Sequence, residues 1–267
     1  MQFVCSPQQS AHHNTPITTE RRMANPNNYQ FLEWDSQHFG LRIAACYWDG
    51  DVLFLSKVLA TAKKEFLDLL SLFSPVDTVI PDDLLRQFSA IHCSGRVEFC
   101  KKIEYRDNAH RLVHENVIVL NKESCYRNYL RPLAVLAGKH SRFLTDPRLP
   151  KEKGEELFVL WADKSVTGER ADIVFGALES TNKLVGFVTV RQEDNAARIG
   201  LIAVIPQEQR KGWGKALLQS AEHWARSRGL KQLRVATQAE NTAACRFYTA
   251  NGFEKQQCLM VYHLWFH

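Results

Sequence analysis

The sequence of 267 residues lacks the features that mark several unusual classes of protein. With 13 Gly and 9 Pro it is neither collagenous nor of low complexity. No apolar run approaches the roughly 20 residues of a membrane span, and the N-terminus lacks the basic and then apolar segments of a secretory signal. The seven cysteines form no C-x-x-C pair, which favours free thiols in a reducing compartment over disulfides or a zinc site. We therefore expect a cytoplasmic protein without a bound metal.

The chain also lacks a large excess of charge of either sign. The chain has 34 Lys and Arg against 29 Asp and Glu, a formal net charge of +5. Nucleic-acid-binding proteins usually concentrate many more basic residues on one face, so we expect no nucleic-acid partner. The apolar content of 45% is ordinary for a globular protein. A small anionic ligand remains compatible with this mild excess of positive charge.

The chain divides into three regions. Residues 1–28 are rich in Gln, Asn, Thr, Pro and His without periodicity, and are expected to be a flexible leader. Residues 29–125 give mixed signals and form an N-terminal region. Within it, the patterns predict strands over 43–48, 78–80 and 114–120, and helices over 58–73 and 82–90.

Residues 126–267 have clearer periodicity and are expected to form a second, α/β domain. A helix over 215–228 has an apolar stripe and ends at Gly229. Asn241 is placed to cap the last helix. The patterns predict helices over 130–140, 155–164, 215–228 and 242–250, and strands over 173–179, 183–191, 198–205, 233–237 and 258–266.

A basic, glycine-containing turn joins the strand over 198–205 to the helix that follows it. Glycines let a ligand approach the backbone closely, and the N–H groups at a helix start favour an anion. The spacing matches neither a Walker A loop nor a dinucleotide-binding G-x-G-x-x-G. The turn is therefore predicted to bind a phosphate group; the alternative is a plain strand–turn–helix corner with solvated charges. Its residues are Gln209, Arg210, Lys211, Gly212, Trp213 and Gly214.

This turn resembles the Q/R-x-x-G-x-G/A pyrophosphate loop of GCN5-related N-acetyltransferases, and the order of elements from Ile173 to His267 is similar to the core of that family. The resemblance implies a mixed, mostly antiparallel sheet flanked by helices, with residues 126–267 binding acetyl-CoA. It also implies that the loop amides hold the pyrophosphate. The preceding strand, through Ile202, Ala203 and Val204, would bind the pantetheine arm and donate an N–H near Ala203 to the oxyanion.

Two residues of the last helix are candidates for chemistry. Asn241 and Tyr248 are seven residues apart, which places them near one helical face. The resemblance implies that Asn241 contacts the cofactor, besides serving as a helix cap. It implies that Tyr248 is the general acid for the departing thiolate, whereas the alternative is a core aromatic. A phenol with a pKa of about 10 is protonated at neutral pH and can donate that proton.

A closer resemblance is to enzymes that acetylate dTDP-4-amino-4,6-dideoxygalactose for bacterial surface polysaccharides, such as enterobacterial common antigen or lipopolysaccharide. It rests on Trp34 to Gly40, on Ser141 to Phe143 and on Arg234 to Asn241, and is weakest between Asp49 and Asn128. It implies that residues 29–125 contribute to binding a dTDP-amino sugar. Aromatic rings can stack on a base, and Arg can clamp a diphosphate. The implied substrate-binding residues are Trp34, Phe39, Ser141, Arg142 and Phe143; the alternative for Trp34 and Phe39 is the core.

Several alternatives stay open. The general base is unassigned among Glu193, Glu98, Glu104, His140 and water. The acceptor could instead be a protein, polyamine or drug amine, or the chain could be a coenzyme A-binding module without catalysis. The oligomeric state, a homodimer included, is also open.

Overall fold

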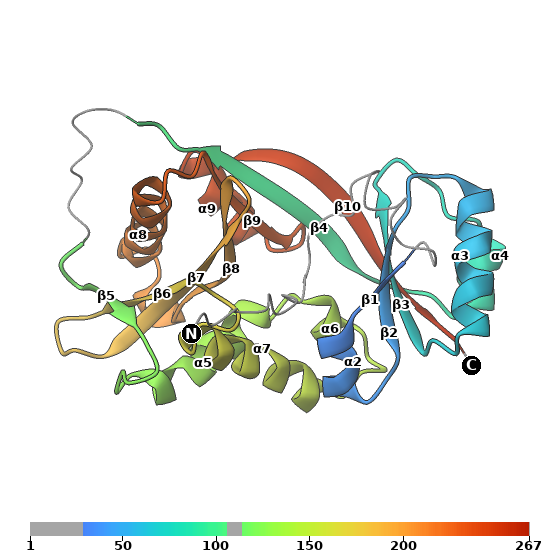
Figure 1. The fold of residues 1–267 in the computed structure, drawn as a ribbon, viewed down its shortest axis with the longest axis horizontal. Helices are drawn as coiled ribbons and strands as arrows, with labels where there is room; N and C mark the ends of the chain where they lie inside the picture. The colour runs from blue at the N-terminus through green and yellow to red at the C-terminus, as the bar shows by residue number, and fades with distance from the viewer. Residues whose placement is uncertain (1–28, 106–113, 267) are drawn as a thin grey trace, which may run out of the picture.

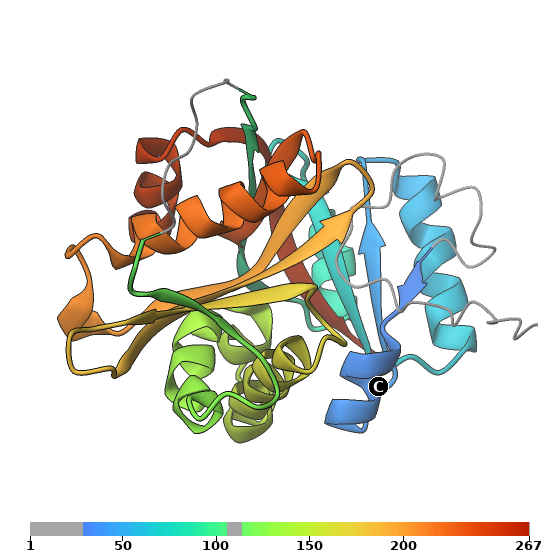
Figure 2. The ribbon, with the colours of Figure 1, turned by 60° about the vertical axis from the view of Figure 1, so that its left-hand side comes forward.

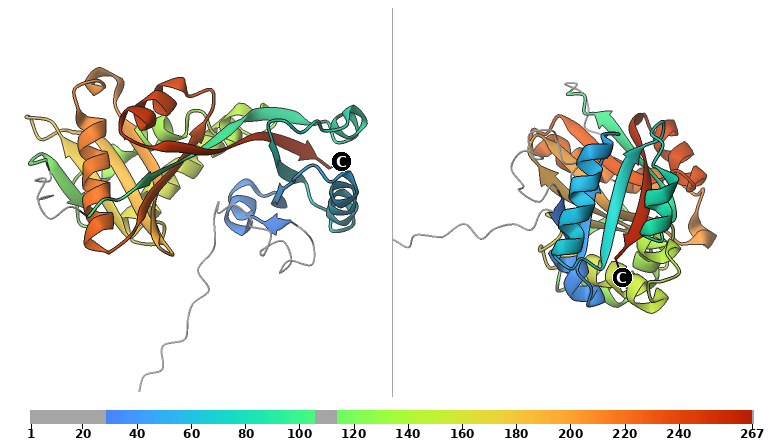
Figure 3. Two further views of the ribbon diagram at one scale, coloured as in Figure 1. Left: turned by 90° about the horizontal axis from the view of Figure 1, so that it is seen from above. Right: turned by 90° about the vertical axis from the view of Figure 1, so that its right-hand side faces the viewer.

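The computed structural model describes residues 29–105 and 114–266; the leader expected over 1–28 lies outside them. One mixed sheet of ten strands, ordered β1-β2-β3-β10-β4-β9-β8-β7-β6-β5, runs through the described chain. Its two longest strands, β4 (Ile91–Lys102) and β10 (Glu254–Trp265), lie side by side in the middle. They extend from one half of the molecule into the other (Figures 1 and 3). The sheet is therefore continuous across residue 125, and the domain boundary placed there stays a prediction.

The N-terminal half forms one end of this sheet. Its strands are β1 (Gln30–Phe31), β2 (Ile43–Tyr47) and β3 (Leu69–Pro75), and β2 pairs with β3 in parallel. The helices α3 (Val52–Lys64) and α4 (Asp82–Gln87) bury one face of these strands. On the other face lie α2 (Glu33–Phe39) and α6 (Arg142–Thr145), so a helix of the second half covers strands of the first.

The C-terminal half sandwiches the rest of the sheet between helices (Figure 2). The helices α8 (Trp213–Ser227) and α9 (Thr242–Ala250) bury one face. The helices α5 (Leu130–Gly138) and α7 (Lys151–Val166) bury the other. Short 3₁₀ turns lie at Arg127–Tyr129 and Pro206–Glu208. The strands are β5 (Val117–Leu120), β6 (Ile173–Leu178), β7 (Leu184–Glu193), β8 (Ala196–Val204) and β9 (Gln232–Gln238).

The predicted elements of the C-terminal half are confirmed within a few residues at most ends, whereas two in the N-terminal half are wrong. The helix predicted over 58–73 is α3, which ends at Lys64, and its last part is the strand β3. Almost every residue of β3 is buried, and a continuous apolar run does not distinguish a buried strand from a helix. The strand predicted over 78–80 is irregular chain. The pattern also missed α2 and β4.

The strands β8 and β9 diverge along their length. They pair in parallel only from Ala196 to Ile199 of β8. Beyond that point β8 contains a bulge, where Gly200 and Leu201 face the single residue Thr189 of β7. The bulge moves alternate side chains to the other face: Ile199 packs towards α8, but Leu201 packs towards α5 and α7. The sheet therefore opens between the ends of β8 and β9.

No helix in the described ranges combines the length and hydrophobicity that crossing a membrane requires. The six cysteines within those ranges are all free thiols.

Candidate active site

A cavity of about 880 Å³ occupies the opening between β8 and β9 and continues between the two halves. One end is lined by β8, the start of α8, the end of β9 and α9. The other end is lined by α2, β3, β4, α6, α7 and the loop before α6. We call these the coenzyme end and the acceptor end. Both substrates of a transfer reaction can meet in such a continuous space.

The turn before α8 has the open backbone that the sequence predicted. Arg210 and Gly212 have φ of +63° and +96°, a left-handed conformation that favours glycine. A Cβ added at Gly212 would have no neighbouring atom within 4 Å, so the space beside it is free for a ligand. The first turn of α8 has no side-chain cap, which leaves N–H groups for an anion. These features fit the pyrophosphate of coenzyme A.

The residues of this turn differ in what they contact. Gln209 donates from Nε2 to the carbonyl oxygen of Val204 at 3.0 Å, which ties the turn to β8. Lys211 donates to Glu208 at 2.6 Å, and the Trp213 indole donates to the same carboxylate at 3.1 Å. These hydrogen bonds hold the pKa of Glu208 below its usual value. Gln209, Arg210, Gly212 and Gly214 line the cavity, whereas Lys211 and Trp213 do not.

Part of the β8 backbone faces the opening. The N–H of Ile205 donates to Val185, and that of Leu201 donates to the Thr189 hydroxyl, both on β7 at 2.9 Å. Backbone groups of successive strand residues point to opposite sides, so the N–H groups of Ile202 and Val204 point away from β7. That of Ala203 points towards β7. The N–H groups that face the opening near Ala203 are thus those of Ile202 and Val204, and all three residues line the cavity.

Both candidate residues of α9 line the coenzyme end. Asn241 caps α9, its side-chain oxygen accepting from Ala244 N–H at 3.2 Å. Tyr248 is 3% exposed and packs against Phe99, Phe247 and Phe253. Its hydroxyl has no hydrogen-bond partner among the described residues. Burial raises the pKa of Tyr248 above its usual value, so the phenol keeps its proton.

Four of the five predicted substrate-binding residues line the acceptor end: Trp34, Ser141, Arg142 and Phe143. Phe39 does not. It is buried in the core, with its ring 5.2 Å from that of Phe143. The prediction that Phe39 binds substrate is therefore not supported, because α2 points this ring into the protein. Ser141 acts as the N-cap of α6, accepting from Phe143 N–H at 3.1 Å.

The acceptor end also contains residues that the sequence did not indicate. Arg170 lies over the Trp34 ring at 4.1 Å, and Trp161 meets Trp34 edge to face at 6.4 Å. Arg96 projects from β4, and Asp35 from α2. In the sequence, Ser94, Arg96 and Glu98 alternate with apolar residues, a pattern equally typical of a solvent-facing strand. Only the docking of α6 against β4 makes this face internal.

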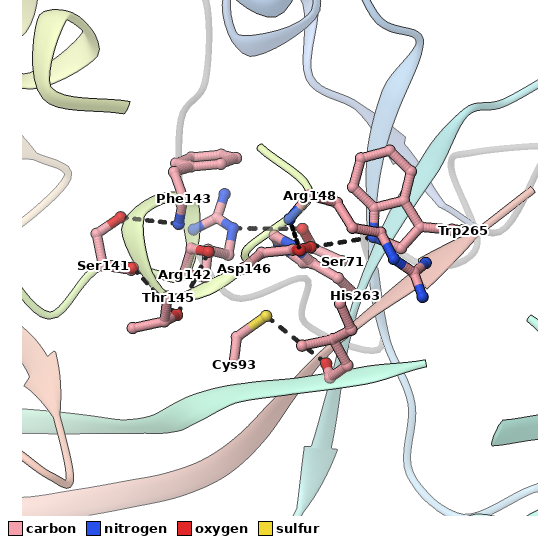
Figure 4. Close-up of polar contacts among 11 residues, drawn as sticks. Ser71, Cys93, Ser141, Arg142, Phe143, Thr145, Asp146, Arg148, His263 and Trp265 are labelled. Carbon is pink, nitrogen blue, oxygen red and sulfur yellow. Dashed lines mark hydrogen bonds and ion pairs between the residues drawn. The ribbon is translucent and has the colours of Figure 1, made fainter. Parts of the chain in front are cut away.

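A buried hydrogen-bonded network holds α6 in place (Figure 4). Asp146, directly after α6, accepts from His263 Nδ1 at 2.7 Å and from the Trp265 indole at 3.0 Å, both on β10. Burial lowers the pKa of His263, which keeps the ring neutral. Burial opposes ionisation of Asp146, but these hydrogen bonds hold its pKa below the usual value. The network therefore joins the helix that bears Arg142 to the central strand.

Cys93, Asp146 and His263 lie within 4.8 Å of one another, as metal ligands do. The contacts of Asp146 are already explained by its hydrogen bonds. Burial raises the pKa of the Cys93 thiol to about 12, and metals bind the thiolate. The donor set therefore does not suit a metal.

The general-base candidates are separated by their contacts. Glu193 pairs with Arg198 at 2.6 Å, and Glu98 pairs with Arg96 at 2.8 Å. Neither glutamate lines the cavity, and nor does Glu104. His140 does line it, beside the loop that leads into α6. Of the four candidates from the sequence, only His140 is placed to meet a substrate.

Comparison with known proteins agrees with this geometry. The sequence profile of the Acetyltransferase (GNAT) family matches residues 141–253. The dTDP-fucosamine acetyltransferase of Escherichia coli O6:H1 is 35% identical over 124 residues, which are 46% of this chain and 52% of that protein. The spore coat polysaccharide biosynthesis protein SpsD of Bacillus subtilis is 25% identical over 125 residues, 47% of this chain and 43% of that protein. The chain thus spans about half the length of these curated relatives.

A solved structure extends the likeness to the whole described fold. A functionally unknown conserved protein from Staphylococcus epidermidis superposes with a TM-score of 0.60 at 14% identity, covering 90% of this chain and 92% of that one. At that identity the match concerns the fold alone. The profile match and the divergence of β8 from β9 together identify the domain: residues 141–253 of this chain form an acetyltransferase domain of the GNAT family.

Proposed function

We propose that this protein transfers an acetyl group from acetyl-CoA to the amine of a nucleotide-linked amino sugar, dTDP-4-amino-4,6-dideoxygalactose being the candidate acceptor. One observation carries the proposal: the cavity has basic groups at both ends, with an aromatic wall between α2 and α7. Coenzyme A accounts for the positive charge at one end. The guanidinium groups at the other end suit an acceptor that is itself anionic. The E. coli relative, a dTDP-fucosamine acetyltransferase, supports this class of acceptor.

The coenzyme end suits the cofactor in detail. N–H groups of the turn from Gln209 to Gly214 would hold the pyrophosphate. The unpaired edge of β8 at Ile202 and Val204 would hydrogen-bond the pantetheine arm as an added strand would. Asn241, at the start of α9, lies beside the same path.

The proposed reaction uses these positions. The neutral amine attacks the thioester carbonyl carbon, and the new C–N bond forms as the carbonyl oxygen becomes an oxyanion. The N–H of Ile202 would donate to that oxygen. When the C–S bond breaks, Tyr248 would give its phenolic proton to the thiolate. The nitrogen loses a proton to water or to His140, and the products are an amide and free coenzyme A.

The test compares acceptors. The dTDP-linked amino sugar should be acetylated with a kcat/KM at least about a hundredfold above that of the free amino sugar. Contacts remote from the amine supply orientation in the transition state, and removing them lowers kcat as well as affinity. The steady-state rate of coenzyme A release gives kcat and KM for each of the two acceptors. Equal kcat/KM values would move the assignment to a polyamine, drug or protein amine, and absence of turnover with any amine would indicate a binding module.

A further inference from the structure

We propose that Arg96 and Arg142 together form an anion-binding subsite at the acceptor end, which takes the phosphate groups of a nucleotide-linked acceptor. The proposal rests on the proposed function for the identity of the acceptor. It adds a second guanidinium, from β4, that no motif in the sequence indicated. It also names the part of the substrate that this end of the cavity recognises.

Arg142 is held in place but lacks a full set of hydrogen-bond partners. Its Nε donates to the Ser71 hydroxyl at 3.3 Å, and its guanidinium lies over the Phe143 ring at 4.2 Å. Nη2 is 3.7 Å from Asp35 Oδ2, an ion pair too long for a hydrogen bond. Nη2 is buried without a hydrogen-bond partner. A buried charged donor in this state is costly, and an anion in the adjoining cavity would compensate for it.

Arg96 presents a second guanidinium to the same space. Its Nη2 donates to Glu98 at 2.8 Å, while its Nε is buried without a hydrogen-bond partner. Its side chain is 14% exposed, against 11% for Arg142, and both residues line the cavity. Arg96 is close enough to Arg142 to contribute, after burial, to the lowering of the pKa of Arg142. Both guanidinium groups line the same cavity, and an anion bound between them would offset their mutual repulsion.

The charges that line the cavity favour an anion over a cation, although Glu98, behind the lining, pairs with Arg96. Asp35 is the one carboxylate among the described residues that line the cavity. Arg142 and Arg170 both interact with it, and burial nevertheless raises its pKa. Arg170 forms no ion pair among the described residues, although the carboxylates of Asp35 and Glu169 act on it at longer range. Guanidinium groups bind phosphate through paired N–H donors, so this excess suits a phosphate or diphosphate.

The subsite is preorganised by the structure around it (Figure 4). Ser141 caps the helix that carries Arg142, and Asp146 anchors that helix to His263 and Trp265 of β10. Arg96 lies on β4, which pairs with β10 along its length. Both guanidinium groups are thus attached to the same rigid centre of the sheet. Little conformational entropy would be lost when an anion binds.

The experiment is a calorimetric titration of dTDP into protein saturated with coenzyme A, so that the turn before α8 cannot take up the probe. We expect dTDP to bind at least about tenfold more tightly than thymidine. Arg96→Gln and Arg142→Gln should each weaken dTDP binding about tenfold or more and leave thymidine binding unchanged. The matched control is Arg226→Gln, which removes a guanidinium that pairs with Glu222 on α8, outside the cavity. This variant should bind dTDP and thymidine as the wild type does.

Unchanged dTDP binding in Arg96→Gln, or equal binding of dTDP and thymidine to the wild type, would overturn the proposal. If Arg96→Gln does not fold, Arg96→Lys replaces it in the test, because lysine keeps a positive charge beside Glu98. Arg96→Lys should still weaken dTDP binding, since it removes the paired N–H donors of the guanidinium. The two proposals fail separately. If dTDP binds through these arginines but no dTDP-amino sugar is acetylated, the subsite stands and the transfer reaction is wrong. If the sugar is acetylated with the same KM in both Gln variants, the subsite is wrong.

Discussion

The coenzyme end and the acceptor end of the cavity are built in different ways. The coenzyme end comes from consecutive elements, β8 to α9, and most of its contacts are offered by backbone groups. The acceptor end comes from α2, β3, β4, α6 and α7, which are far apart in the sequence, and its polar contacts are offered by side chains. The first arrangement leaves a compact motif in the sequence. The second leaves isolated residues whose common role only the fold reveals.

The strongest test of the coenzyme end is Gly212→Asp, which should abolish binding of acetyl-CoA. The side chain would enter the open space at this residue and bring a carboxylate towards the pyrophosphate. Calorimetry with coenzyme A measures the loss. Gly229→Asp is the control, since Gly229 also has a positive φ, of +72°, and open surroundings, but lies at the other end of α8. Both variants carry similar backbone strain, so unchanged binding in Gly212→Asp would mean that the turn is not the pyrophosphate site.

Tyr248→Phe tests the chemistry between the two ends. It should lower kcat by about 10²–10⁴-fold, or roughly 3–5.5 kcal/mol of barrier, with little change in the KM for acetyl-CoA. The aromatic packing is kept and only the proton donor is lost. Tyr105→Phe is the control, because it removes a hydroxyl that donates to Leu230 outside the cavity. If the Tyr248 variant keeps more than about a third of the wild-type kcat when chemistry limits the rate, Tyr248 is a core residue only.

At the acceptor end, substitution of Phe39 should affect mainly the stability of the fold, whereas substitution of Trp34 should affect mainly substrate binding. Phe39→Ala should lower the free energy of unfolding by about 3–5 kcal/mol, since it leaves a cavity in the core. Trp34→Leu should change stability less and raise the KM for the nucleotide-linked sugar about tenfold, because Trp34 lines the cavity. Chemical denaturation and steady-state kinetics on both variants provide the comparison. The reverse pattern would place Phe39 at the substrate and Trp34 in the core.

A smaller effect concerns pH and the network that anchors α6. Burial lowers the pKa of His263 in the folded protein. Below pH about 6.5, His263 therefore binds a proton more readily in the unfolded chain than in the folded protein. The contribution of His263 to stability is therefore present above pH about 6.5 and is lost as the pH falls. Urea denaturation at pH 7.5 and 5.5 should show less loss on acidification for His263→Gln than for the wild type. His223→Gln, at an exposed histidine, should behave as the wild type does.

How well the sequence predicts the helices and strands also differs between the elements of the coenzyme end and those of the acceptor end. The amphipathic stripe of α8 and its Gly229 stop, and the Asn241 cap of α9, are local signals, and the structure confirms these helices. The strand β3 was mistaken for helix because it is buried on both faces. The alternation in β4 is typical of a strand, but it does not reveal that Ser94 and Arg96 face a cavity, because that cavity exists only once α6 docks against β4.

The sequence by itself determined the coenzyme end: the left-handed turn at Gly212, the helix that follows it and the positions of Asn241 and Tyr248 all follow from neighbouring residues. Backbone conformation and helix periodicity are local properties, so a short motif is enough to specify them. Only the tertiary structure decided the acceptor end, where Phe39 enters the core while Trp34 lines the cavity, and where Arg96 joins Arg142. The direction in which those side chains point depends on long-range strand pairing and helix docking. The pairing of β4 with β10 and the bond from Asp146 to His263 set that direction.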